Sequence, residues 1–93
     1  MLVSMGGIKK YWLFIIFNTG LKENEIKNRI DKIMNKVDIH EVLDMGTKLL
    51  AYEVKGQKEG HYYKITFDGN IDDLELPTDD DVDVIKKLII KVD

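Results

Sequence analysis

The chain contains no cysteine, and this absence excludes disulfide bonds and thiolate metal sites. Ser4 is its single serine, so no nucleophile stands beside a base in any of the usual arrangements. The longest apolar run, Tyr11 to Phe17, has seven residues, far fewer than the ~20 that cross a bilayer. We therefore expect a non-enzymatic protein of a reducing compartment, with no cofactor, no small-molecule substrate and no membrane span.

Basic residues are also in short supply for a nucleic-acid binder. Lys and Arg number 14 against 17 Asp and Glu, which gives a net charge of -3. Phosphate neutralisation supplies most non-specific affinity for RNA, so the charge argues against strong binding by the chain alone. The rest of the chain is basic, because the acidic residues crowd into one stretch: Asp72, Asp73, Glu75, Asp79, Asp80, Asp81 and Asp83.

Metal sites are not expected either. The run Asp79 to Asp83 looks superficially like a calcium loop, but the glycine at its sixth position and the glutamate at its twelfth are missing. We interpret it as a solvated acidic loop. His40 and His61 lie near opposite ends of a predicted hairpin without a second ligand at metal spacing, so both are interpreted as surface or turn-edge histidines.

The 93 residues predict one domain, residues 9–93, after a flexible lead-in of residues 1–8. Strands are expected over residues 11–17, 39–55, 61–67 and 84–92, with a turn at 56–60 and a bend or bulge at Met45-Gly46. An amphipathic helix is expected over residues 22–37. A short second helix should open after Gly69-Asn70 and end by about Leu76, because Pro77 cannot donate a backbone hydrogen bond.

This order predicts an α+β fold, a ferredoxin-like β-α-β-β-α-β sandwich with two helices on one face of a four-stranded antiparallel sheet. Strand periodicity places Leu13, Ile15, Phe17, Tyr63, Ile65 and Phe67 on the helix side. The opposite, open side receives Trp12, Phe14, Ile16, Tyr62 and Lys64. A face this apolar needs covering, so Trp12, Phe14, Ile16 and Tyr62 are the candidate protein-partner residues.

RNA recognition through the sheet is an alternative, because the RNA-recognition motif shares this strand order and stacks bases on aromatic side chains. Tyr11, Phe14, Tyr62 and Tyr63 invite it. Against it, Tyr62 stands where that motif has Gly or Ala, and Lys64 stands where it has an aliphatic residue.

A basic patch is a further candidate. Lys9 and Lys10 precede the first strand, and Lys86, Lys87 and Lys91 lie on the last. These two strands are neighbours in a ferredoxin-like sheet, so the five lysines are expected to form one patch for phosphate contacts.

The stretch from Gly46 to Lys55 resembles the signature hairpin of the bacterial small-subunit ribosomal protein six family. That motif reads Gly, any residue, basic, polar, Leu, small, Tyr, any residue, Ile, basic. The matching residues are Gly46, Lys48, Leu50, Ala51, Tyr52 and Lys55. Leu49 stands where a polar residue is usual, Val54 replaces the Ile, and Met45 stands where an aromatic is common. The resemblance runs from about Lys9 to Asp93, although Pro77 and the acidic loop depart from the family's pattern.

The resemblance implies a non-enzymatic constituent of the small ribosomal subunit, located in the cytoplasm or in an organelle. It implies binding to small-subunit rRNA as a heterodimer with a basic partner, the S-eighteen protein. The rRNA-binding residues would be among those that flank the family-like motifs and avoid the acidic loop: Lys9, Lys10, Lys48, Lys55, Lys86 and Lys91. The alternative is a stand-alone ferredoxin-like module for protein interaction or ligand binding, which could form a homodimer through the open face.

Overall fold

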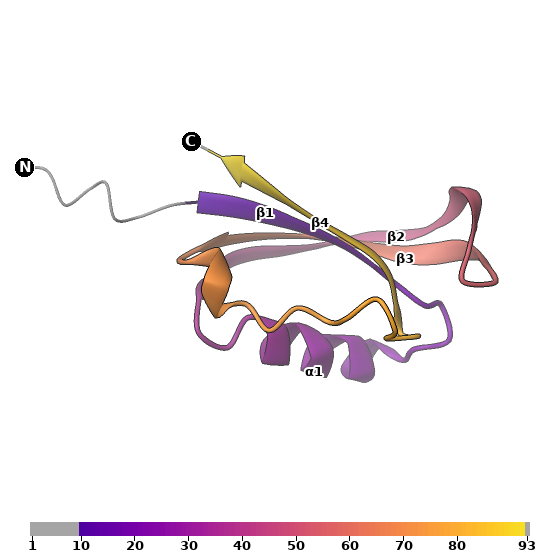
Figure 1. Ribbon diagram of the computed structural model, residues 1–93, viewed down its shortest axis with the longest axis horizontal. Helices are drawn as coiled ribbons and strands as arrows, with labels where there is room; N and C mark the ends of the chain where they lie inside the picture. Colours follow the sequence, from indigo (N-terminus) through magenta and orange to yellow (C-terminus); the bar gives the residue numbers. More distant parts are fainter. Residues whose placement is uncertain (1–9, 93) are drawn as a thin grey trace, which may run out of the picture.

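The computed structural model describes residues 10–92, which form a four-stranded antiparallel sheet with one α-helix against it (Figure 1). In chain order the elements are β1 (Lys10–Phe17), α1 (Glu23–Ile33), β2 (Asp38–Val54), β3 (Gln57–Asp68), a 3₁₀ turn (Ile71–Asp73) and β4 (Val84–Val92). The strands lie in the order β2-β3-β1-β4. The predicted sheet is confirmed, and so is the contact between its first and last strands. The proposed lead-in, residues 1–8, and Lys9 lie outside the described residues.

The hydrophobic core lies between the sheet and α1. Burial alternates along β1 with the period of two expected of a strand that has one covered face. All six residues assigned to the helix side from the sequence are buried, as predicted. The core consists of Tyr11, Leu13, Ile15 and Phe17 from β1, Tyr63, Ile65 and Phe67 from β3, Val84 from β4, and Ile26, Ile30, Ile33 and Met34 from α1 and its end.

α1 is shorter than the predicted helix. It begins after Lys22, whose backbone N–H donates to the Glu25 carboxylate at 2.8 Å and so satisfies one free donor of the first turn. It ends at Ile33 because Met34 leaves the helical conformation, and the Val37 N–H then donates to the Met34 carbonyl in a turn. Val37 lies in the turn before β2, and its apolar side chain still packs against the core. Within residues 10–92, no helix combines the length and hydropathy needed to span a bilayer.

The predicted short second helix is confirmed only in part, because a 3₁₀ turn stands at its predicted start in place of an α-helix. Ile71–Asp73 make a single 3₁₀ turn, after which Leu74 is extended and residues 74–78 form neither helix nor strand. Leu74 and Leu76 both pack against the core, and a spacing of two brings both side chains to the same side only in an extended chain. Pro77 also disfavours a helical conformation for the residue before it.

The extended segment takes the place of the missing helix. Figure 1 shows it beside α1 on the same face of the sheet, and the Glu75 N–H donates to the Ile33 carbonyl at 3.1 Å. One helix and one extended segment therefore cover the face that two helices were expected to cover.

The β2–β3 hairpin turns through two residues, Lys55 and Gly56, so the predicted turn over residues 56–60 is too long. Their φ angles of 52° and 76° are those of a type I′ turn, whose twist matches that of the strands it joins. The predicted bulge at Met45-Gly46 is confirmed. Gly46 has a φ of 82°, the pairing shifts between Asp44 and Gly46, and the Gly46 N–H donates to the Asp44 carboxylate at 2.8 Å.

Candidate functional site

The face of the sheet turned away from α1 is apolar along its centre. We call it the open face and define it by nine residues: Trp12, Phe14, Ile16, Tyr62, Lys64, Thr66, Lys86, Leu88 and Ile90. The register sets Trp12, Phe14 and Ile16 opposite Ile90, Leu88 and Lys86 on β4, and opposite Thr66, Lys64 and Tyr62 on β3. Leu88 is 56% exposed and Ile90 38%. The four predicted partner residues thus lie together, and β4 adds two apolar side chains that the sequence analysis left out.

Trp12 is held on the open face by its neighbours. The Lys64 ammonium lies 4.0 Å from the centroid of the indole, a cation–π contact. The Phe14 ring meets the indole edge to face, with the centroids 6.2 Å apart. These two contacts orient the indole while the residue stays only half buried.

Fewer aromatic side chains lie on the open face than RNA recognition in the manner of the RNA-recognition motif would need. Tyr11 is buried on the helix side, where its ring stacks on Phe67 with centroids 5.6 Å apart. Tyr63 is also buried there, packed against Phe17 at 5.8 Å. Two of the four aromatic residues that favoured base stacking are therefore unavailable, which argues against the RNA-recognition-motif mode.

A groove of about 300 Å³ continues the open face towards the hairpin turn. We call it the apolar groove. It is lined by Phe14, Ile16 and Tyr62 of the open face, by Leu50, Ala51, Tyr52 and Val54 of β2, and by Ile85, Lys86, Lys87 and Leu88 of β4. The sequence analysis used Leu50, Ala51 and Tyr52 as motif residues but did not place them beside the partner residues. The hairpin pairing that brings them there depends on the register shift between Leu49 and Val54.

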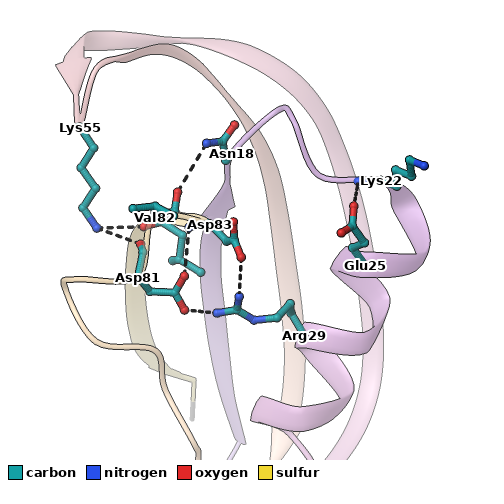
Figure 2. A network of polar contacts seen from close by, with 9 residues as sticks. Asn18, Lys22, Glu25, Arg29, Lys55, Asp81, Val82 and Asp83 are labelled. Atoms are coloured by element: carbon teal, nitrogen blue, oxygen red, sulfur yellow. Dashed lines mark hydrogen bonds and ion pairs between the residues drawn. The ribbon is translucent and has the colours of Figure 1, made fainter.

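The acidic loop, residues 79–83, is tied to the fold on two sides (Figure 2). The guanidinium of Arg29 on α1 donates to the Asp83 carboxylate at 2.9 Å and also to the Asp81 carboxylate. On the other side the Lys55 ammonium donates to the carbonyls of Val84 at 3.0 Å and Asp81 at 3.4 Å. The prediction of a solvated acidic loop is therefore wrong for Asp81 and Asp83, which pair with the chain's single arginine.

These contacts change the acidity of Asp81. Burial by itself would raise the pKa of its carboxyl group. The hydrogen bond from Arg29, the Asp83 N–H and the charges of Arg29 and Lys55 outweigh burial and lower the pKa. Asp81 is therefore ionised and paired at neutral pH.

The described lysines of the patch expected on β1 and β4 lie on two faces of the sheet. Lys86 on β4 belongs to the open face, opposite Ile16 near the end of β1. Lys10 lies on the same side of the sheet at the start of β1, because it precedes the helix-side residue Tyr11. Lys91 lies opposite Tyr11, so it belongs to the helix side, as does Lys87, which lies opposite Ile15. The single patch expected on β1 and β4 is therefore wrong, because neighbouring residues of a strand point to opposite faces.

The remaining two described candidates lie on the hairpin. The Lys48 ammonium is 5.6 Å from the centroid of Tyr62, beside the open face. Lys55 contacts the acidic loop, so the expectation that all six lysines avoid this loop is wrong for Lys55. Lys9 is not among the described residues.

The histidines pair with carboxylates. His61 Nε2 lies 2.7 Å from Asp44 Oδ1, and this hydrogen bond is the main reason that the pKa of Asp44 is lowered. His40 Nε2 lies 2.6 Å from the Asp68 carboxylate. Each histidine thus has one carboxylate partner, and residues 10–92 hold no group of three side chains suited to a metal ion.

Comparison with known proteins identifies the family. The model of the family described as "Ribosomal protein S6" matches residues 10–91. This chain belongs to the ribosomal protein S6 family. Ribosomal protein S6 is a structural, non-enzymatic protein, so the expectation that this chain is not an enzyme is confirmed by its family.

Individual S6 relatives agree with this assignment. A bS6 protein of Trichlorobacter lovleyi is 34% identical over 67 residues, which cover 67% of this chain and 55% of the relative. One from Helicobacter pylori strain Shi470 is 34% identical over 92 residues, covering 90% of this chain and 65% of the relative. The crystal structure of Thermotoga maritima S6 superposes with a TM-score of 0.77 at 26% identity, covering 91% of this chain and 88% of that one. The chain spans between about half and two thirds of the length of the curated relatives it matches.

The S6-like motif residues have separate structural tasks. Gly46 makes the bulge, and Lys55 makes the first position of the turn and holds the acidic loop. Leu50, Ala51 and Tyr52 line the apolar groove, and Tyr52 is 70% exposed. The motif therefore builds one wall of the groove and the turn that closes it.

Proposed function

We propose that this chain is a structural constituent of the small ribosomal subunit that binds small-subunit rRNA together with an S-eighteen-like partner protein. Its place is then the ribosome in the cytoplasm. The main support for the proposal is that residues of the S6-like hairpin and residues of the open face line the same apolar groove. A lone domain seldom leaves a continuous apolar surface of this kind in water.

The partner surface is assigned to Trp12, Phe14, Ile16 and Tyr62. These side chains are neighbours across β1 and β3, and Leu88 and Ile90 extend the same surface over β4. Aromatic anchors on a rigid sheet suit a protein interface, because their positions are set before binding and little side-chain freedom is lost. A basic partner fits a chain of net charge -3.

The rRNA contacts are assigned to lysines, since phosphate contacts position a protein without reading sequence. The candidates are Lys9, Lys10, Lys48, Lys55, Lys86 and Lys91. Lys10 and Lys86 are the sharpest test, because both are exposed and flank the apolar open face. RNA bound by these two residues would run along the edge of the partner surface, which is the arrangement that joint binding with a protein requires.

Cosedimentation with small ribosomal subunits tests the proposal. The full-length chain should travel with the subunit, and the doubly substituted chain Lys10→Glu, Lys86→Glu should be outcompeted by the unchanged chain. The deficit should be largest at low salt and shrink as the salt concentration rises, because the unchanged chain makes more phosphate contacts and its affinity falls more steeply with salt. A chain found only in the free pool would overturn the proposal.

A stand-alone module remains the second candidate, and the uncovered open face is the observation that favours it. Two copies could bury this face against each other. Sedimentation velocity of the chain without partner separates the two: a stable dimer that Trp12→Ala dissociates, together with no cosedimentation, would favour the module.

A further inference from the structure

We propose that a cavity between the hairpin turn and the start of β4 binds a phosphate group, and that this group belongs to the backbone of the RNA. The assignment to RNA rests on the proposed function, whereas the phosphate site itself does not. The cavity has a volume of about 180 Å³. We call it the lysine cavity, after Lys55, Lys86 and Lys87, which line it together with Thr78, Asp79, Val84 and Ile85.

The charge of the lining favours an anion. Three lysines and one aspartate line the lysine cavity, so its lining residues carry a net positive charge although the whole chain is negative. Lys86 and Lys87 are consecutive, yet both reach the cavity from β4. They point to opposite faces of the sheet, but β4 is an edge strand, and the cavity lies where side chains from both faces line it.

Lys55 is held in place before any ligand arrives. Its ammonium donates to the Val84 carbonyl at 3.0 Å and the Asp81 carbonyl at 3.4 Å. An ammonium group has three N–H donors, so one donor remains for a ligand. A cation fixed by backbone carbonyls loses little further freedom on binding, which favours the recognition of a small anion.

Arg29 keeps the acidic loop from cancelling this charge. Figure 2 shows the Asp81 and Asp83 carboxylates turned to the Arg29 guanidinium, while Lys55 lies on the opposite side of the loop. The hydrogen bonds of the Lys55 ammonium go to the carbonyl oxygens of Asp81 and Val84, and not to a carboxylate. Arg29 therefore pairs with two of the loop's carboxylates, and these carboxylates point away from the Lys55 ammonium.

Asp79 forms a weak ion pair with Lys87 at the proposed phosphate site. Its carboxylate lies 3.4 Å from the Lys87 ammonium, and its side chain is 99% exposed. An ion pair this exposed contributes little, so a phosphate can displace it. Phosphate oxygens would then accept from Lys87 and from the Thr78 hydroxyl group, whose residue lines the same cavity.

The position of the lysine cavity explains how protein and RNA binding can be joined. Ile85, Lys86 and Lys87 line both the lysine cavity and the apolar groove. A partner seated in the groove would therefore touch the same stretch of β4 that holds the phosphate.

The test is an NMR titration of the full chain, following lysine side-chain and backbone signals, with dimethyl phosphate as the RNA-like diester and inorganic phosphate as the free anion. Shifts should concentrate at Lys55, Lys86, Lys87 and Thr78. Lys87→Gln should weaken binding roughly tenfold, the effect of losing one charge-assisted hydrogen bond. Lys36→Gln, which removes the same charge from an exposed turn outside the cavity, should not.

The acidic loop supplies a second matched pair. Asp79→Asn should tighten phosphate binding more than Asp80→Asn, because both remove one negative charge but only Asp79 lines the cavity. Equal effects of these two substitutions, or shifts spread over all lysines, would overturn the site.

The RNA arm distinguishes this proposal from the proposed function. Binding to an rRNA fragment with the partner present should show a salt slope that is smaller by about one for Lys87→Gln than for Lys36→Gln. If the two variants have the same salt slope while the chain still cosediments with small subunits, the phosphate of the cavity does not belong to RNA. The proposed function is then unaffected. Phosphate shifts at the cavity without cosedimentation overturn the proposed function and leave the phosphate site standing.

Discussion

Gly60 lies directly beneath Ile16: a Cβ atom on Gly60 would come within 2.3 Å of the Ile16 Cγ2 atom. The same atom would lie 3.3 Å from Ile85 Cδ1 and 3.5 Å from Leu50 Cδ2. Gly60 is buried, and its missing side chain is what lets these residues from β1, β2 and β4 meet at the apolar groove.

Replacing Gly60 by Ala should therefore lower the free energy of unfolding by about 1–3 kcal/mol, the usual cost of forcing atoms into a packed site. Urea denaturation followed by circular dichroism measures it. Gly20→Ala is the matched control, because the nearest atom to a Cβ there is Asn18 Oδ1 at 3.4 Å. Equal stability of the two variants would show that the sheet relaxes around Ile16 without cost.

Arg29→Gln should destabilise the fold by roughly 1–2 kcal/mol, because it removes charge-assisted hydrogen bonds to Asp81 and Asp83 that are only partly exposed. Lys27→Gln removes the same charge from an exposed site on α1 and should change the free energy of unfolding by less than about 0.5 kcal/mol. Thermal unfolding at neutral pH compares the two. A loss no greater than that of Lys27→Gln would mean that Arg29 does not hold the loop, and that contacts such as those of Lys55 and of the Asn18 N–H, which donates to the Asp83 carbonyl at 2.8 Å, are sufficient.

The advantage conferred by Arg29 should disappear in acid. The pKa of Asp81 is lowered in the folded chain, so its stabilisation is present above the unfolded pKa and is lost as the pH falls through the folded one. The stability difference between the unchanged chain and Arg29→Gln should hold from pH 7 to about 5 and then shrink below about pH 4. Asp44 also titrates there with a lowered pKa, but it is present in both chains and cancels. A difference constant down to about pH 2 would contradict the pairing.

Trp12→Ala should reduce affinity for an S-eighteen-like partner at least tenfold while changing folding stability less. A half-buried aromatic residue on an open face contributes more to an interface that buries it than to its own domain. Titration of the partner against each chain gives the affinity. Leu49→Ala is the control, since Leu49 is 77% exposed and does not line the groove. Parallel losses in folding and binding would mark Trp12 as a structural residue.

The intrinsic fluorescence of the single tryptophan reports on the same surface. Adding partner should shift the Trp12 emission to shorter wavelength as water leaves the indole. Deleting residues 1–7 tests whether the N-terminal segment covers the indole instead. Exposure of Trp12 by this deletion, with no further change on adding partner, would remove the interface from the open face.

Some of the candidate site was predictable because strand alternation is local. The alternation in β1 and β3 assigned Trp12, Phe14, Ile16 and Tyr62 to one face, and the register confirms their neighbourhood. The same rule, applied to β4, would have separated Lys86 from Lys87 and added Leu88. The apolar groove could not be predicted from the sequence, because which residues of β2 line it depends on where the hairpin turns. That choice follows from the positive φ angles of Lys55 and Gly56, which a lysine seldom adopts.

The sequence by itself determined the four strands, the amphipathic helix, the bulge at Gly46 and the S6-like hairpin, since each is written in a short period or in a glycine at a fixed place. Only the tertiary structure decided that Leu74 and Leu76 cover the core in extended form, because packing against a preformed sheet outweighs a weak helical preference. It also decided the fate of the acidic loop. Arg29 and Asp83 are 54 residues apart in the chain, and only folding brings the opposite charges close enough to pair.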